Sequence, residues 1–317
     1  MRILMTGGAG FIGSNFVHYM LDKYPDYELT DVDALTYAGN PDNLARAMDN
    51  PRHRFVQGRI EDGSLIDGLM KGIDVVINFA AESHVDRSIL EPQVFITTNI
   101  LGTQVLLDAS LKHGIKLFCQ ISTDEVYGAL GLESKVSFTE ESQLRPNSPY
   151  SASKTSADLL ARAYFRTYEL PVVVTRCSNN YGPRQHPEKF IPTVILNAYN
   201  DRPVPIYGDG LYVRDWIHVL DHCRAIDTVI HKGKPGEIYN IGADQEWANI
   251  ELAKTILRML GKPETLLTSV PDRPGHDRRY AITAEKIRGE LGWEPQETFE
   301  SGLKATVDYY CAMYPKG

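Results

Sequence analysis

The first part of the chain constrains the fold more than any other. An apolar run at 2–6 predicts a buried strand, and a helix is predicted over about 14–23. The turn between them carries Gly7, Gly10 and Gly13. Glycines here let the chain turn tightly and let backbone N–H groups approach a pyrophosphate at the helix N-terminus. The spacing is looser than GxGxxG. Its position directly after a strand nevertheless predicts dinucleotide binding rather than a purely structural turn.

Asp33 ends the second predicted strand, twenty positions after Gly13. An acid at this place binds the ribose hydroxyls of the adenosine and repels a 2′-phosphate. The sequence therefore favours NAD over NADP, whereas the alternative is an ordinary acid at a strand end. The strand predicted over 74–81 is continuously apolar, which is typical of parallel strands buried on both faces.

These patterns predict an α/β chain: a Rossmann-type doubly wound parallel sheet with a smaller, mostly C-terminal α/β substrate domain. We expect residues 1–178 plus 213–243 to form the NAD-binding domain. Residues 179–212 plus 244–317 are expected to bind the substrate. A length of 317 residues is compatible with two domains.

Composition and charge argue against several kinds of binding partner. The formal net charge is −8, so no overall basic surface indicates nucleic acid or anionic lipid as a partner. We find no signal peptide and no apolar run of membrane-spanning length. The four cysteines are widely spaced and form no CxxC pair, which predicts buried thiols rather than disulfides or a metal site. A cytoplasmic protein is the simplest expectation.

Two adjacent acids, Asp124 and Glu125, follow the strand predicted over 117–122 and the hydroxyl of Thr123. Neighbouring side chains of a strand point to opposite faces, so both acids can serve one site only where the backbone is irregular. The carboxyl edge of a parallel sheet is where ligands bind. Two carboxyls there suggest one proton donor and one acceptor. The alternative is that Asp124 begins a turn and Glu125 is solvated.

A helix predicted from about 150 to 168 begins with Tyr150 and carries Lys154 one turn later. The two residues therefore lie on one helical face. We expect the lysine ammonium to lower the pKa of the phenol, so that Tyr150 can take a proton from an alcohol during hydride transfer. Alone, this spacing is usually that of a surface pair. Because this chain also has the glycine turn and Asp33, the spacing becomes a strong signal for a catalytic tyrosine and lysine.

The segment 271–280 is rich in cations although the chain is acidic, and its proline and glycine residues keep it non-helical. A solvated charge run is the usual interpretation. Because the same half of the chain needs a ligand, we predict instead that Arg273, Arg214 and Lys189 bind a diphosphate, for which arginine is well suited.

Taken together, these motifs resemble those of the extended short-chain dehydrogenase/reductases and, among them, the dTDP-glucose 4,6-dehydratase family. The resemblance spans nearly the whole chain, and Thr123-Asp124-Glu125 is its most specific part. It rests on the glycine turn, Asp33 with 35–40, Ala80 to Ser88, Thr123 to Glu125, Tyr150 with Lys154, Asn179 to Pro183, Arg214 to Trp216, and Asp272 to Tyr280.

The resemblance implies a role for each catalytic residue. Tyr150 would deprotonate the glucose 4-hydroxyl, assisted by Lys154 and Thr123, while a hydride passes to NAD. Glu125 would remove the C5 proton, and Asp124 would protonate the departing 6-hydroxyl. Hydride would then return to C6, and a proton to C5.

The resemblance also implies the binding residues and the assembly. The family is usually a homodimer that pairs the helices predicted at about 99–113 and 150–168. Besides Tyr150 and Lys154, the cofactor would contact Gly7, Gly10, Phe11, Ile12, Gly13, Asp33, Leu35, Thr36, Ala38, Gly39, Arg59, Ile60, Ala80, Ala81, Ser83 and Thr98. Besides the three residues of 123–125, the sugar nucleotide would contact Ser83, His84, Asn179, Glu188, Lys189, Arg214, Asn249, Arg273 and His276.

The chain departs from the family pattern at two positions near the adenine. Arg59 stands where an aspartate is usual, and Asp31 where an asparagine is common. We hypothesise that Arg59 and Asp31 form an ion pair beside the adenine. His218 also stands where a tyrosine is common, which puts little in doubt.

Other functions on this scaffold stay open at this point. They are a sugar-nucleotide 4-epimerase, a UDP-glucuronate decarboxylase, and a 4,6-dehydratase acting on another nucleotide. The two acids argue against an epimerase, which needs no acid/base pair for elimination. A catalytically idle NAD sensor or scaffold is a different class, and the complete Thr-Tyr-Lys set argues against it. Thymidine as the nucleobase is implied by resemblance alone.

Overall fold

Seven parallel strands form the central sheet of the computed structural model, which describes residues 1–272 and 274–316. Their order is β10-β6-β5-β4-β1-β2-β3. The order reverses beside β1, so that a crevice opens at the carboxyl ends of the strands. The Rossmann-type fold is thereby confirmed. The strands are β1 (Arg2–Thr6), β2 (Glu28–Asp33), β3 (His53–Gln57), β4 (Val75–Asn78), β5 (Leu117–Thr123), β6 (Val172–Cys177) and β10 (Ile238–Ile241).

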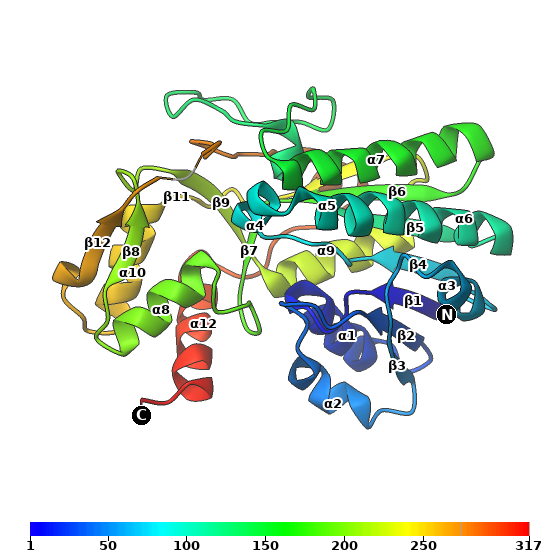
Figure 1. Ribbon diagram of the computed structural model, residues 1–317, viewed down its shortest axis with the longest axis horizontal. Coiled ribbons are helices and arrows are strands. Elements are labelled where there is room, and N and C mark those ends of the chain that lie inside the picture. The colour runs from blue at the N-terminus through cyan, green and yellow to red at the C-terminus, as the bar shows by residue number, and fades with distance from the viewer. Residues whose placement is uncertain (273, 317) are drawn as a thin grey trace.

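Helices cover both faces of this sheet (Figure 1). The first face carries α1 (Phe11–Lys23), α9 (Val219–Lys232) and α11 (Glu285–Leu291), which share one core with β1, β4 and β5. The second carries α3 (Gly63–Leu69), α6 (Thr103–His113) and α7 (Pro149–Tyr168). Shorter helices lie beside these layers: α2 (Ala45–Met48) and η1 (Pro41–Leu44) pack next to α1, and α4 (Val85–Leu90) and α5 (Pro92–Phe95) pack next to α7.

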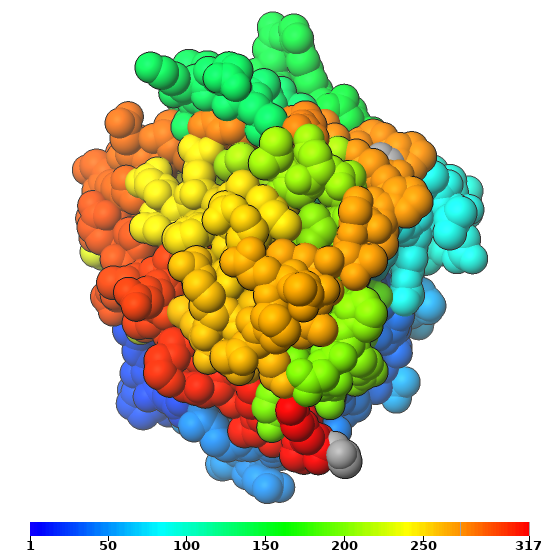
Figure 2. All heavy atoms as spheres, turned by 90° about the vertical axis from the view of Figure 1, so that its left-hand side faces the viewer, coloured from blue at the N-terminus to red at the C-terminus, as the bar shows by residue number. Residues whose placement is uncertain are grey.

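A smaller group of elements lies beyond one end of the sheet and has its own core (Figures 1 and 2). One three-stranded sheet contains β7 (Asn179–Tyr181), β9 (Val213–His218) and β11 (Glu246–Ala248). Two parallel strands, β8 (Val204–Tyr207) and β12 (Leu267–Val270), form another sheet. Around them pack α8 (Phe190–Tyr199), α10 (Asn249–Met259), η4 (Glu264–Leu266) and α12 (Phe299–Met313).

The helix expected over 99–113 begins earlier than its sequence pattern indicates. It runs on from α5 through a π-helical segment, η2 (Ile96–Gly102), into α6. The continuous stretch 92–113 is long and apolar enough to cross a membrane by length and composition, contrary to our expectation from the sequence. Leu106 and Leu107 of this stretch are fully buried in the core against the sheet, as in the core helix of a globular domain.

One buried carboxylate joins α1 and α9 on the first face of the sheet. Asp227 of α9 accepts hydrogen bonds from Tyr19 (2.8 Å), Lys23 (2.5 Å) and Tyr24 (3.0 Å), all of α1. Its other neighbour is His231, whose Nδ1 lies 3.0 Å from Oδ1. Burial alone would raise the pKa of Asp227, but His231, Lys23 and the tyrosines lower it to about 2.

Asp227→Asn should destabilise the fold by about 2 to 4 kcal/mol, because four donors lose a charged acceptor. The stabilisation by the carboxylate is present above its unfolded pKa of about 3.9 and is lost as pH falls toward the folded value. Urea unfolding at pH 7 and pH 3 should therefore separate Asp227→Asn from the parent at pH 7 more than at pH 3. Asp26→Asn, at an exposed acid, is the control and should match the parent. Equal stability of Asp227→Asn and the parent at pH 7 would contradict this role.

Candidate active site

At the glycine turn before α1, segments of the backbone pass so close to one another that no side chain would fit between them. Gly7 has φ +74°, and a Cβ there would lie 2.8 Å from the backbone nitrogen of Ala80. A Cβ on Gly13 would lie 2.3 Å from the carbonyl oxygen of Gly7. Gly10 is the N-cap of α1, so no side chain caps the first N–H groups, and the first turn holds no acid. This uncapped, uncrowded helix N-terminus fits a pyrophosphate.

Gly13→Ala should prevent NAD from being retained, because the new methyl group would displace the Gly7 backbone that forms the cradle. Gly68→Ala is the matched control: it lies in α3, and a Cβ there meets nothing within 4 Å. That substitution should keep the full complement of NAD and stabilise the fold by about 0.5 to 1 kcal/mol. The checks are NAD released from the purified proteins on acid precipitation and their melting temperatures. Full retention of NAD by Gly13→Ala would exclude this cradle.

Asp33 lies at the end of β2, as expected, and lines the cavity described below. Its Oδ2 accepts from the backbone N–H of Ala9 (2.9 Å) and its Oδ1 from that of Leu35 (2.7 Å). Burial raises the pKa of its carboxyl, and the N–H groups of Leu35 and Ala9 oppose this effect. The acid thus holds the turn of β1 against the loop that follows β2, with its carboxylate at the cavity.

The hypothesised ion pair between Arg59 and Asp31 is wrong. Asp31 is fully buried, and its Oδ1 accepts from the Gly8 backbone N–H at 2.9 Å. Burial and the neighbouring Asp33 raise the pKa of Asp31 to about 8, so its carboxyl is largely protonated at neutral pH. Arg59 lies on the surface, 3.7 Å from Glu61. The Asp31 carboxyl group occupies the space where a side chain on Gly8 would lie, so it packs under the glycine turn and does not reach Arg59.

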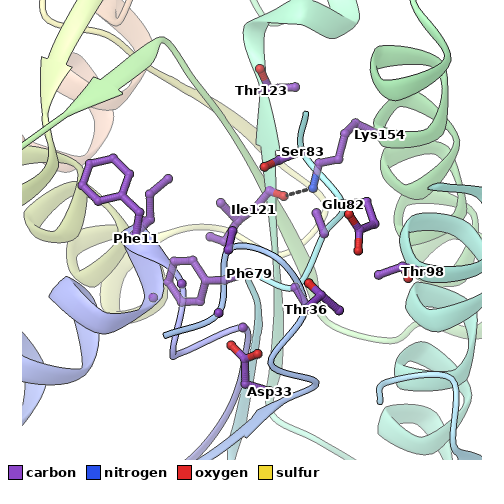
Figure 3. A pocket seen from close by; sticks show the side chains of 18 of the residues that line it. Phe11, Asp33, Thr36, Phe79, Glu82, Ser83, Thr98, Ile121, Thr123 and Lys154 are labelled. Carbon is purple, nitrogen blue, oxygen red and sulfur yellow. Dashed lines mark hydrogen bonds between the residues drawn. The ribbon is translucent and has the colours of Figure 1, made fainter. Parts of the chain in front are cut away.

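One cavity, of about 310 Å³, runs along the carboxyl edge of the sheet (Figure 3). It joins the glycine turn to the end of β5, so the expected cofactor and catalytic residues line a single space. All five expected catalytic residues line it. So do these expected cofactor contacts: Gly7, Gly10, Phe11, Ile12, Gly13, Asp33, Thr36, Ala38, Gly39, Arg59, Ile60, Ala80, Ala81, Ser83 and Thr98. Leu35 does not line the cavity, but its backbone N–H donates a hydrogen bond to Asp33, which does.

The two acids lie where the strand stops. Thr123 ends β5 and caps a short 3-10 helix, η3 (Asp124–Tyr127), by accepting from the N–H of Glu125 at 3.3 Å. The Thr123 hydroxyl donates to Asp124 Oδ1, also at 3.3 Å. The helical turn breaks the strand alternation that would send neighbouring side chains to opposite faces. Asp124 and Glu125 therefore both line the cavity.

Asp124 is suited to donate a proton. It is 2% exposed, and its Oδ2 has no hydrogen-bond partner within the described part of the chain. Burial raises the pKa of its carboxyl well above the ordinary value, and the neighbouring Glu125 and Asp215 raise it further. A carboxylic acid kept neutral at pH 7 can act as a general acid, while its neighbour serves as the base.

Tyr150 and Lys154 lie on one face of α7, as predicted, and both are buried. Lys154 Nζ donates to the carbonyl oxygen of Ile121 at 2.7 Å, the contact drawn in Figure 3. The net shift of the Tyr150 pKa is upward, whereas the Lys154 ammonium was expected to lower it. Burial raises the pKa of the phenol well above its ordinary value, and Glu125 adds to this. Burial also lowers the pKa of the Lys154 ammonium.

The residues expected to bind the sugar nucleotide divide into two groups. Ser83, Asn179 and Lys189 line the cavity with the catalytic residues. His84 and Glu188 lie beside them, with His84 Nε2 3.7 Å from Glu188 Oε2.

Three other expected substrate residues, Arg214, Asn249 and His276, lie outside the cavity lining. Arg214 donates to the Asp277 carbonyl oxygen, and the His276 ring stacks on Tyr212 with centroids 3.7 Å apart. Asn249 opens α10. Arg273 lies outside the described residues.

Several lining residues were not predicted. Glu82, Cys177, Gln185 and His186 all face the cavity. Glu82 follows β4, and Cys177 ends β6, so the carboxyl-edge rule could have found both. Gln185 and His186 belong to the loop after β7, a strand whose pairing with β9 the sequence pattern did not indicate. Their place depends on contacts between distant segments.

Comparison with known proteins agrees with this geometry. The family model described as GDP-mannose 4,6 dehydratase matches residues 4–306. Low-salt glycan biosynthesis protein Agl12 of Haloferax volcanii is 55% identical, over 98% of each chain. A dTDP-glucose 4,6-dehydratase of Actinoplanes sp. is 50% identical, again over 98% of each chain.

The likeness extends to three dimensions. The crystal structure of DesIV, a dTDP-glucose 4,6-dehydratase from Streptomyces venezuelae solved with NAD bound, has a TM-score of 0.96 and 50% identity to this chain. The match covers 98% of this chain and 97% of that one. The chain therefore belongs to the GDP-mannose 4,6 dehydratase family, as its full-length likeness to dTDP-glucose 4,6-dehydratases also shows.

Proposed function

We propose that this enzyme is an NAD-dependent hydro-lyase that converts dTDP-glucose to dTDP-4-keto-6-deoxyglucose. One observation carries the proposal: Asp124 and Glu125 line the same cavity as Tyr150, Lys154 and the glycine turn. The Tyr-Lys pair supports oxidation of an alcohol, and the two acids support elimination of water. About 50% identity to dTDP-glucose 4,6-dehydratases over the full length supports the same substrate.

When bound, NAD supplies an acceptor that takes the hydride from C4 and later returns it to C6. Tyr150 accepts the proton of the 4-hydroxyl, while the Lys154 ammonium and the Thr123 hydroxyl stabilise the developing charge. The resulting 4-ketone acidifies the C5–H bond, and Glu125 removes that proton. Asp124, whose pKa burial raises, gives its proton to the 6-hydroxyl as water leaves. A proton then returns to C5.

Asp33 supports NAD rather than NADP as the cofactor. Its carboxylate lines the cavity and is fixed there by the N–H groups of Ala9 and Leu35. A fixed negative charge at this place would repel a 2′-phosphate. Because the hydride is returned in each turnover, NAD need not leave, and tight retention is favoured.

The direct test is product formation from glucose carried on thymidine, uridine, cytidine and guanosine diphosphates. We expect a product that has lost one water, formed most efficiently from the thymidine compound, with no added NAD consumed. A 4-epimer from UDP-glucose would indicate an epimerase. Loss of carbon dioxide from UDP-glucuronate would indicate a decarboxylase. NAD binding without any turnover would indicate a sensor or scaffold.

For the diphosphate of the substrate we propose Lys189, Arg214 and Arg273. Lys189 supports this, since it lines the cavity beside Ser83, to whose carbonyl it donates at 3.3 Å. We also assign Asn179, Glu188, Asn249 and His276 to substrate binding, with His84 at the rim.

The division into two domains is likewise proposed: 1–178 plus 213–243 for NAD, and 179–212 plus 244–317 for the sugar nucleotide. The return of 213–243 to the first domain is supported by β10, which pairs with β6, and by α9, which packs on α1. β9 pairs with β7 and β11, so this strand lies at the border between the two domains.

We propose a homodimer that pairs the helices over 92–113 and 149–168. Apolar side chains exposed on these helices support it, including Leu101 and Leu159, each about half exposed. In analytical ultracentrifugation the parent should sediment as a dimer and Leu159→Lys as a monomer. Leu211→Lys, at an equally exposed leucine elsewhere, is the control and should remain dimeric. We also propose a cytoplasmic location, which the buried free thiols of Cys119, Cys177 and Cys223 support.

A further inference from the structure

A third titratable residue continues the catalytic face of α7. Asp158 follows Lys154 by four residues, as Lys154 follows Tyr150. Residues at this spacing are neighbours on a helix, with Cβ atoms about 5 to 6 Å apart. Asp158 is 2% exposed, and none of the roles assigned above uses it. An acid this buried on the catalytic face needs a physical explanation.

The partner of Asp158 comes from the neighbouring strand. Arg176 of β6 is 3% exposed, and its Nε donates to Asp158 Oδ2 at 3.0 Å. Its Nη1 donates to the hydroxyl of Tyr127 at 2.9 Å, and that hydroxyl donates to Asn240 at 2.7 Å. Because η3, β6 and β10 all contribute, the guanidinium is fixed in place. Asp158 and Arg176 are called the buried pair below.

The guanidinium favours the ionised form of Asp158. Burial raises the pKa of the Asp158 carboxyl, but Arg176, Ser122 and Lys154 oppose this effect. Burial would lower the pKa of Arg176, yet Asp158 and Tyr127 raise it above its ordinary value. Since arginine does not lose its proton in proteins, Arg176 opposes protonation of Asp158 at every working pH.

Among the described residues, few other titratable groups near Lys154 could oppose the lowering of its pKa by burial. On its own helix it faces Tyr150 and Asp158, and from β6 it faces the Cys177 thiol, whose pKa burial raises to about 12. Burial lowers the pKa of the Lys154 ammonium, and Asp158 is the largest effect that opposes this. After β5 come Asp124 and Glu125, and after β4 comes Glu82, all on the cavity side. From α6, Asp108 is engaged by Tyr164 near the far end of α7.

We propose that the buried pair keeps the ammonium of Lys154 charged and directed at the Ile121 carbonyl, so that Tyr150 can take the proton of the sugar hydroxyl. Asp158 supplies the negative charge that Lys154 needs, and Arg176 holds the Asp158 carboxylate in place through the hydrogen bond from its Nε to Oδ2. The row Arg176, Asp158, Lys154 then carries one net positive charge next to the phenol. Asp158 and Arg176 are positioning residues, since they act through Lys154. The inference rests on the proposed function.

The test compares two variants that should shift the same property in opposite directions. Asp158→Asn removes the anion and leaves Arg176, so the Lys154 pKa should fall by about one unit or more, as expected for loss of a nearby opposite charge. Arg176→Met leaves the anion to Lys154 alone, so that pKa should rise. In the two holoenzymes the alkaline limb of the pH profile of kcat/KM should therefore move to lower pH with Asp158→Asn and to higher pH with Arg176→Met. Asp158→Glu, which keeps the charge, should restore the parental limb.

Asp308→Asn is the matched control. Asp308 also follows a lysine by four residues, with Lys304 Nζ at 2.6 Å, but both side chains are exposed. The substitution should leave the pH profile unchanged. If Asp158→Asn does not fold, Asp158→Asn combined with Arg176→Met removes both buried charges, and its limb should still lie below that of the parent. Unchanged limbs in the Asp158 and Arg176 variants, or shifts of both in the same direction, would overturn the proposal.

A second measurement separates this inference from the proposed function. The Lys154 ammonium can be titrated by NMR with ¹³C-labelled lysine, its signal being assigned by its loss in Lys154→Met. If the signal shifts as predicted but no substrate is dehydrated, the proposed function fails and the role of the buried pair stands. If dehydration is observed but Lys154 titrates identically in all variants, the proposed function stands and the pair has no such role.

Discussion

Glu125→Gln should lower the rate of dehydration by a factor of about 10² to 10⁴, the usual contribution of a general base. Glutamine keeps the shape of the side chain but cannot accept the C5 proton. NAD should remain bound, because the contacts proposed for it arise from the glycine turn, Asp33 and Lys154. The measurements are the initial rate of 4-keto-6-deoxy sugar formation and the NAD content of the purified protein.

Asp124→Asn should lower the same rate by a similar factor of about 10² to 10⁴, but for another reason. Here C5 can still lose its proton to Glu125, whereas the 6-hydroxyl has no acid to protonate it. Solvent deuterium should therefore enter C5 of unreacted substrate with Asp124→Asn and not with Glu125→Gln. This difference assigns the base and the acid separately.

Glu133→Gln provides the control for both acids. It makes the same chemical change on an exposed side chain a few residues farther along the chain, and it should dehydrate at the parental rate. If Glu125→Gln and Asp124→Asn also dehydrated at that rate, the assignment of both carboxyls would be wrong. Equal deuterium entry in the two variants would instead mean that their roles are not divided.

Tyr150→Phe should stop the reaction at its first step, again by a factor of about 10² to 10⁴. The phenol is buried on the face of α7 that also carries Lys154, and phenylalanine fills the same space without a base. Rapid mixing with substrate should then give no transient absorbance of reduced nicotinamide, which Asp124→Asn should still show. That contrast places Tyr150 before the elimination and Asp124 within it.

Tyr168→Phe is the control for this prediction, since it removes a hydroxyl from the exposed end of the same helix. It should leave the transient unchanged. Parental reduction of the cofactor by Tyr150→Phe would mean that another group takes the proton of the 4-hydroxyl. In that case the contact between Lys154 and the Ile121 carbonyl would serve structure alone.

The pH dependence of the first step should follow the environment of Tyr150. Burial and the charge of Glu125 raise the pKa of the phenol well above its ordinary value. Because Glu125→Gln removes a negative charge, it should lower that pKa. The transient reduction of the cofactor should then persist to lower pH in Glu125→Gln than in the parent. An unchanged profile would show that the two groups are not coupled.

Short-range features of the site could be predicted from the sequence because they depend on neighbours along the chain. The glycine turn, Asp33 at a strand end, and the Tyr150-Lys154 face each require only a few consecutive residues and a regular period. The two acids after β5 follow the same rule, and they line the cavity as their position at the strand end predicted.

Features that depend on packing between distant segments could not be predicted. Asp31 and Arg59 were expected to pair because their charges are opposite. Instead, the Asp31 side chain packs in the space beside Gly8, and Arg59 lies at the surface. The placement of Gln185 and His186 at the cavity depends on the pairing of β7 with β9.

The sequence by itself determined which chemical groups this protein can bring to a substrate: a base with its lysine, two carboxyls, and a turn that admits a pyrophosphate. Only the tertiary structure decided how their pKa values shift, because burial, not sequence spacing, raises the pKa of Asp124 and of Tyr150 and lowers that of Lys154. It also brought Arg176 of β6 to Asp158 of α7, eighteen residues apart, and so gave the catalytic helix face a charge that no local pattern specifies.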